Sequence, residues 1–164
     1  MILTVEFAQL QMPRGGVVAF PVVDLTVNGV DVAPIRCLID TGARGVRLPG
    51  TTAEAFGVDL SHADPGPAHI IGGTQTRLYE TYVDLACAGF QWQAPVSFCV
   101  PDFAGFGLAG LRGFFDKIHV GVDGYLALVE LEPHDDRLER LGLDATGRPH
   151  KERTVPRDPR GGCP

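Results

Sequence analysis

A carboxylate stands directly after an apolar run in the stretch CLIDTG (37–42). Burying an unpaired carboxylate is costly, so an acidic residue at the end of a strand that enters a core has either a partner or a chemical role. A carboxylate in such a place can transfer protons as a general acid or base, and Gly42 allows the backbone to approach a substrate closely. The alternative is structural, because Asp40 can also close an Asx-type turn onto the backbone of Gly42.

The composition limits the classes of protein to which the chain can belong. Its 164 residues, of which 45% are hydrophobic, suffice for one domain with a substantial core. The net charge of −6 makes nucleic acid and anionic membrane surfaces poor partners, and the sequence lacks an apolar run long enough to cross a membrane. The first 16 residues lack the basic start of a signal peptide, so we expect a cytoplasmic protein.

The cysteines and histidines do not suggest a metal site. The four cysteines (Cys37, Cys87, Cys99 and Cys163) include no C-x-x-C pair, and the five histidines are scattered without zinc-ligand spacing. We therefore expect buried free thiols in a reducing compartment and no metal ion or organic cofactor.

The elements that would position Asp40 are strands and tight turns. Asn28-Gly29 predicts a hairpin of residues 17–27 and 30–40, and Ala88-Gly89 predicts another of residues 77–87 and 90–100. A third hairpin is predicted over 119–131, and short helices are predicted near 51–57, with a capping box, and at 114–118. Frequent glycine and proline favour the same architecture, an all-β fold with one or two short helices.

The composition changes near residue 133. The last 32 residues contain no aromatic side chain and five of the 13 prolines, so they can bury little apolar surface. We expect a folded domain over 1–132 and a flexible tail over 133–164, in which 134–143 could form a brief helix.

Several motifs in order resemble the retropepsin-like (retroviral-type) aspartic protease family, especially its single-domain bacterial members. They are LIDTGA (38–43), LP (48–49) with the helix that follows it, the glycine-containing IIGGTQT (70–76), and LAGLRGFFDKIHVGVD (108–123). The resemblance covers about residues 16–132 and implies a small closed acid-protease barrel, a single lobe that pairs as a dimer.

The resemblance also implies roles for individual residues. Asp40 would be catalytic, with Thr41 as its brace and Gly42 in the same turn. The residues implied to contact substrate are Ala43 and Arg44 after the turn, Ile71, Gly72, Gly73 and Thr74 in a flap, and Leu108 and Ala109. With one Asp-Thr-Gly per chain, activity would require a homodimer acting on an extended peptide or protein substrate.

Three positions depart from the family pattern. Arg44 stands where Ser or Asp is common, and Gly110 is followed by Leu111, with Arg112 one position later than usual. The customary Asp–Arg support pair therefore cannot form in its usual sense, and Ala109 replaces a larger aliphatic residue. These features favour an alternative function, a non-catalytic dimerisation or peptide-binding module that keeps the fold.

Overall fold

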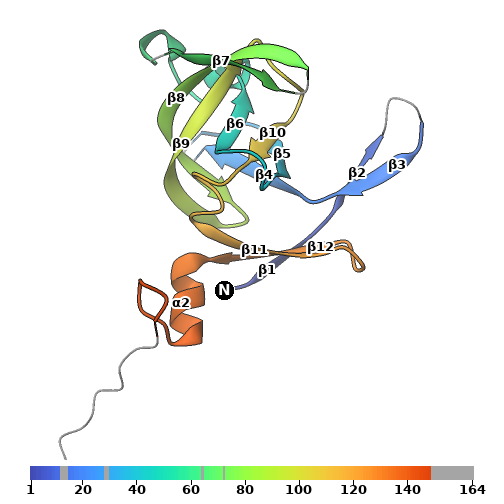
Figure 1. Cartoon of the computed structure of the whole chain (residues 1–164), viewed down its shortest axis with the longest axis vertical. Helices are drawn as coiled ribbons and strands as arrows, with labels where there is room; N and C mark the ends of the chain where they lie inside the picture. The colour runs from blue at the N-terminus through green and yellow to red at the C-terminus, as the bar shows by residue number, and fades with distance from the viewer. Residues whose placement is uncertain (12–14, 28–29, 64, 72, 149–164) are drawn as a thin grey trace, which may run out of the picture.

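The fold is built almost entirely from β-strands, as the sequence predicts (Figure 1). The computed structural model describes residues 1–11, 15–27, 30–63, 65–71 and 73–148. The strands are β1 Leu3–Glu6, β2 Ala8–Gln11, β3 Val17–Phe20, β4 Val22–Val27, β5 Ile35–Ile39, β6 Val46–Pro49, β7 Pro65–Ile71, β8 Thr74–Cys87, β9 Phe90–Val100, β10 Gly107–Ala109, β11 Ile118–Asp123 and β12 Leu128–Pro133. The helices are α1 Thr52–Ala55, the 3-10 helix η1 Leu60–His62 and α2 His134–Leu141.

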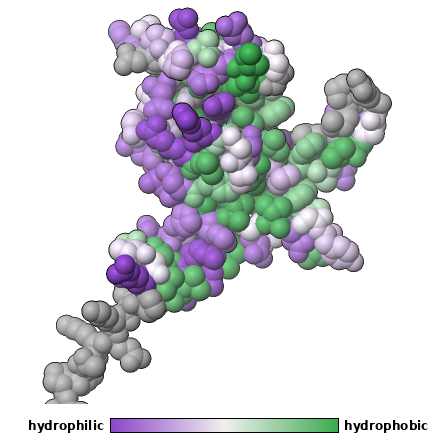
Figure 2. Space-filling view, viewed as in Figure 1, coloured by the Kyte–Doolittle hydropathy of each residue, from purple (hydrophilic) through white to green (hydrophobic). Residues whose placement is uncertain are grey.

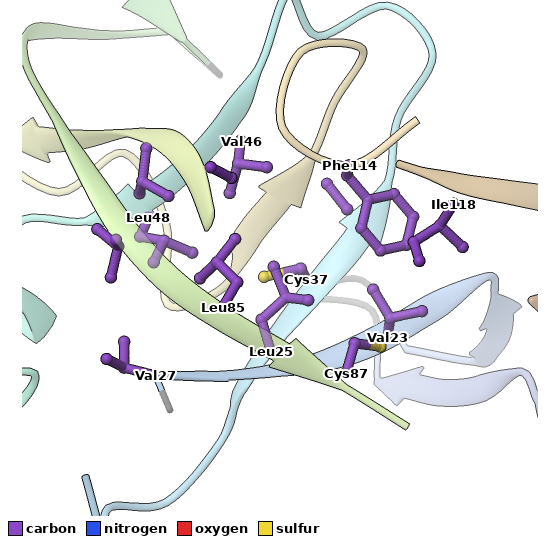
Figure 3. Packing of buried hydrophobic residues seen from close by; sticks show 14 of the residues in the cluster. Val23, Leu25, Val27, Cys37, Val46, Leu48, Leu85, Cys87, Phe114 and Ile118 are labelled. Carbon is purple, nitrogen blue, oxygen red and sulfur yellow. The ribbon is translucent and has the colours of Figure 1, made fainter. Parts of the chain in front are cut away.

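Six of these strands close into a barrel. The strand order is β4-β5-β10-β6-β9-β8, and pairing of β4 with β8 joins the two ends of the sheet. β7 extends beyond β8 as a further strand. Side chains from opposite walls, including Leu25, Leu48 and Leu85, meet inside the barrel without access to water (Figure 3). The closure of the sheet confirms the small closed barrel that the family resemblance implies.

The long β8–β9 hairpin matches its prediction. Cys87 pairs with Phe90 across a two-residue turn, in which Ala88 and Gly89 have φ values of 50° and 85°. A type I′-like turn requires such positive φ values. Along β9, Ala94, Val96 and Phe98 are buried at alternate positions, as a strand with one face in the core requires.

The first predicted hairpin is confirmed only in part. β4 pairs with β5 from Val22–Leu38 to Leu25–Ile35, but residues 17–20 form the separate strand β3, which pairs with β2. Pro21 lies between β3 and β4 and has no N–H to continue the ladder, which explains the break. β2 and β3 together project from the barrel as an arm, which the structure describes over residues 8–11 and 15–20 (Figure 1). The predicted Asn28-Gly29 turn lies outside the described residues.

The predicted short helices are partly corrected. The capping box at the start of α1 does not form, because the Thr51 hydroxyl donates to Asp102 Oδ2 at 2.6 Å instead. Gly57, with φ of 67°, follows the helix as expected. Residues 114–117 form successive turns rather than a helix, Ile118 begins β11, and the Phe114 side chain is fully buried.

The third hairpin and the chain after it form a small second sheet. β11 pairs with β12 from Ile118–Pro133 to Asp123–Leu128, which confirms the predicted hairpin, and β1 pairs with the other side of β12. The loop of this hairpin spans 124–127 and follows Asp123, whose carboxylate accepts hydrogen bonds from the N–H groups of Tyr125 and Leu126.

The first part of the predicted tail is structured. α2 confirms the brief helix predicted there, and Arg140 of this helix binds the buried Glu132 carboxylate through two hydrogen bonds of 2.7 and 2.8 Å. This contact attaches α2 to β12, whereas the sequence predicts flexibility from residue 133. The division of the chain at residue 132 stays a prediction, and residues 149–164 lie outside the described residues. None of the described helices combines the length and apolar character needed to cross a membrane.

Candidate active site

The end of β5 positions Asp40. β5 lies between antiparallel β4 and parallel β10, with Ala109 beside Ile39. The Ile39 N–H donates to the carbonyl of Pro21 at 3.0 Å, and the Asp40 N–H donates to the carbonyl of Ala109 at 3.1 Å. The backbone of Asp40 is therefore fixed from both sides, while its side chain remains partly exposed.

A tight turn follows Asp40. The Gly42 N–H donates to Asp40 Oδ1 at 2.8 Å, and the Ala43 N–H donates to the Asp40 carbonyl at 3.1 Å. This is the Asx-type turn that the sequence offers as the structural interpretation of Asp40. It uses one carboxylate oxygen, and Oδ2 makes no hydrogen bond within the described part of the chain. The turn therefore orients a carboxylate that can still accept or donate a proton.

A second segment crosses the chain that leaves this turn. The N–H groups of Leu111 and Arg112 donate to the carbonyls of Ala43 and Arg44 at 3.0 and 3.1 Å. Gly110 lies so close that an added Cβ would stand 2.3 Å from the Gly45 carbonyl oxygen. Only glycine permits this approach, so the apolar-apolar-glycine pattern at 108–110 serves to support the Asp40 turn.

The predicted substrate-contacting residues fall into two groups. Ala43, Leu108 and Ala109 surround the turn, but their side chains are buried in the domain. Ile71 pairs with Thr74 at the tip of the β7–β8 hairpin, next to Gly73. Contact of both groups with substrate stays a prediction, and so does the role of this hairpin tip as a flap. Gly72 lies outside the described residues.

The side chain of Thr41 is exposed, and that of Arg44 is exposed as well. The Thr41 hydroxyl makes no hydrogen bond to another described residue, so its role as a brace also stays a prediction. An ion pair stands close to the turn, because Arg112 Nη1 donates to Glu80 Oε1 at 3.0 Å. A hydrogen bond with Tyr82, together with the Glu80 charge, raises the pKa of the Arg112 guanidinium.

A cavity of about 300 Å³ opens beside the turn. Its lining residues are Arg44, Gly45, Val46, Arg47, Gly66, Pro67, His69, Leu78, Glu80, Pro95, Ser97 and Arg112. Among these, the sequence predicts only Arg44 as a site residue. Arg47 could have been found from its place between the buried Val46 and Leu48, whose alternation turns Arg47 to the opposite face of β6. Glu80 and Ser97 carry no such local signal, because the strand register alone brings them beside Arg47.

The comparisons with known proteins agree with this geometry. Residues 23–124 match the family described as aspartyl protease, which is more than half of the chain. The fold is similar to that of a retropepsin-like aspartic protease from Rickettsia conorii, with a TM-score of 0.55 and 15% sequence identity over 80% of this chain and 91% of that chain. None of the curated proteins compared with the chain matches it in sequence. The matched residues include the Asp40 turn, its supporting segment at Gly110 and all of the barrel except the first residue of β4, and the chain therefore belongs to the aspartyl protease family.

Proposed function

We propose that the chain is an aspartic endopeptidase that works as a homodimer, with Asp40 of each subunit facing one shared water. The observation that carries the proposal is the placement of Asp40, whose backbone and Oδ1 are fixed while the side chain stays partly exposed. Two facing carboxylates share a proton, because like charges a few ångströms apart cannot both ionise cheaply. One carboxylate takes a proton from the water as the other donates to the scissile carbonyl oxygen.

The projecting arm supports the proposed homodimer. The arm leaves the barrel at Pro21, whose carbonyl binds the N–H of Ile39, the residue before Asp40. A second subunit that brings its own Asp40 to this point would therefore lie beside the arm. Val17 and Val18 on β3 are 56% and 43% exposed, and Figure 2 shows hydrophobic residues along the arm and at its root. An isolated two-stranded hairpin is marginal in water, so a covering partner would stabilise the arm.

The substrate would be an extended peptide, as in other recognition of peptide strands by β-proteins. It would lie between the Asp40 turn and the tip of the β7–β8 hairpin, where Ile71, Gly73 and Thr74 stand, with Gly72 between them in the sequence. Closure of such a tip would exclude water from the shared proton. Thr41 would brace the two turns across the dimer axis, where its exposed hydroxyl can reach the partner.

The alternative function is a non-catalytic dimerisation or peptide-binding module. Two observations favour it: Asp40 Oδ1 is already engaged in a turn within one chain, and the exposed Arg44 adds a positive charge close to that turn. Leu111, which is 49% exposed beside the same turn, would then serve as a contact surface rather than as support for a catalytic pair.

The thiols support a reducing compartment, such as the cytoplasm, for this protein. Cys37, Cys87 and Cys99 are free and buried. Burial raises the pKa of Cys87 to about 12 and that of Cys99 to about 11, so these thiols are poor nucleophiles at neutral pH.

Cleavage of a diverse pool of unstructured peptides across pH 4–8 tests the proposal. The natural chain would be compared with Asp40→Asn at concentrations that populate dimers, with sedimentation confirming that both have the same oligomeric state. We expect the variant to lose at least about 10³-fold in cleavage rate, because it removes both the acid and the base. No cleavage by a folded, dimeric natural chain would favour the module instead.

A further inference from the structure

The cavity beside the Asp40 turn is placed where a bound peptide would pass. Arg44 and Gly45 follow the turn directly, and Arg47 lies on β6 just beyond them. The neighbouring strands β8 and β9 contribute Glu80 and Ser97 to its lining. Figure 2 shows hydrophilic residues over the side of the barrel that β8 and β9 form in Figure 1. The cavity is a recess in the outer surface of the barrel, next to the proposed catalytic carboxylate, and charged side chains are among its lining residues.

The strand register aligns two charged side chains, Arg47 and Glu80, on either side of Ser97 across this recess. Arg47 pairs with Ser97, and Ser97 pairs with Glu80 on the next strand. Residues paired across adjacent strands project to the same face, about 4.8 Å apart from strand to strand. Val46 and Leu48 are buried in the barrel, so Arg47 between them projects to the recess.

The positive charge of the recess is only partly balanced. Glu80 pairs with Arg112 at 3.0 Å. Among the described residues, neither Arg44 nor Arg47 forms an ion pair. Two arginines are thus left without a carboxylate, in a chain whose net charge is −6. Arginine presents a fork of donors that matches a carboxylate, so the missing partner has a defined chemistry.

We propose that this cavity is a substrate subsite that selects an acidic side chain, with Arg47 as the residue that determines the specificity. The inference rests on the proposed endopeptidase function and adds the chemical class of its substrate. A volume of about 300 Å³ is at the small end of ligand sites, which suits a single Asp or Glu side chain. Arg44 adds a second positive charge to the lining of the site, beside the turn that would hold the substrate backbone.

Dimer symmetry sharpens the expected specificity. A twofold axis through the shared water would repeat the cavity in the partner subunit. The substrate would therefore meet one such cavity on each side of the scissile bond. Cleaved sequences should be enriched in Asp or Glu at two positions, one before and one after the cleaved bond, rather than at one.

The first experiment compares cleavage of two decapeptide pools that differ only in carrying Glu or Gln at every acidic position. We expect the natural chain to cleave the Glu pool about tenfold to 100-fold faster, the range of a charge-assisted hydrogen bond gained or lost. Arg47→Gln should abolish this preference. Arg36→Gln is the matched control, since Arg36 lies outside the cavity and pairs with the exposed Asp24, and it should keep the preference. Equal cleavage of both pools by the natural chain would overturn the inference.

A binding measurement separates failure of the subsite from failure of the enzyme. Fluorescence anisotropy with the same labelled pools on Asp40→Asn requires no catalysis. We expect tighter binding of the Glu pool, weakening as salt increases, and loss of the difference in the double variant with Arg47→Gln. If the natural chain cleaves neither pool but this difference is present, the endopeptidase proposal fails and the acidic subsite stands. If the binding difference is missing, or survives Arg47→Gln, the subsite is wrong whether or not peptides are cleaved.

Discussion

Replacing Gly110 by alanine should destabilise the fold around the candidate active site. The added Cβ would stand 2.3 Å from the Gly45 carbonyl oxygen and 2.7 Å from that of Ala43, whereas ordinary van der Waals contact begins near 3.4 Å. The two chain segments must therefore separate by about 1 Å. Both contacts are with backbone atoms, so no side-chain rotation can relieve them.

The size of the expected loss of stability follows from the hydrogen bonds that this separation weakens. The N–H groups of Leu111 and Arg112 donate to carbonyls of the opposing segment at 3.0 and 3.1 Å. In the other direction, the Val46 N–H donates to the Arg112 carbonyl at 3.1 Å. Weakening two or three such bonds at about 1 kcal/mol each, with some overpacking strain, gives a loss of about 2–4 kcal/mol in the free energy of unfolding. For a domain of this size, the urea midpoint would fall by about 1–2 M.

Urea unfolding followed by Trp92 fluorescence measures the effect. Gly105→Ala is the matched control, because no atom outside its chain neighbours lies within 4 Å of a Cβ added there. That control should keep the natural midpoint or exceed it slightly, since alanine restricts the unfolded chain. If Gly110→Ala and Gly105→Ala unfold at the same urea concentration, the close crossing at Gly110 does not support the Asp40 turn.

Two further predictions concern the arm and the C-terminal helix. Val18→Lys should raise the dimer dissociation constant at least tenfold in sedimentation experiments, because burying a valine is worth about 1.5–3 kcal/mol. The control Leu141→Lys, at an exposed position of α2, should leave this constant unchanged. Equal effects of the two substitutions would show that the arm is not part of the interface. The hydrogen bonds from Arg140 lower the pKa of Glu132 to about 2 from 4.5, so this carboxylate stabilises the fold above about pH 4.5 and loses its contribution as pH falls toward 2. Glu132→Gln should flatten the dependence of the urea midpoint on pH in that window, and an unchanged slope would contradict the assignment.

Local sequence patterns predict the fold best where the residues that determine an element lie within that element. The β8–β9 hairpin follows from Ala88-Gly89 and the alternation along residues 90–100, both of which are read within a few residues. The sequence does not predict the arm, because Val17–Phe20 could either continue into β4 or pair with Ala8–Gln11. The break that Pro21 makes in the ladder decides for the pairing with β2. The helix α2 is predicted from the sequence, but its attachment to β12 is not, because that depends on the contact between Glu132 and Arg140, which composition does not reveal.

The candidate site shows the same limit. The Asp40 turn can be predicted from the sequence because Asp, Thr and Gly are adjacent. The supporting role of Gly110 can be predicted from the resemblance to the family. The proximity of Arg47 and Glu80 beside this turn cannot be predicted from the sequence, because their strands are connected in the sheet only through β9. A buried–exposed alternation marks Arg47 as facing outward, but the closure of the barrel determines what it faces.

The most direct test of a shared catalytic pair is the activity of mixed dimers. Natural chain and Asp40→Asn would be unfolded together, refolded at a series of ratios and assayed for peptide cleavage at constant total concentration. If each active site needs two Asp40 carboxylates, activity falls as the square of the natural fraction, so that an equal mixture retains about one quarter. An activity that falls in direct proportion to the natural fraction, retaining half at the equal mixture, would show that each chain acts alone and would contradict the account.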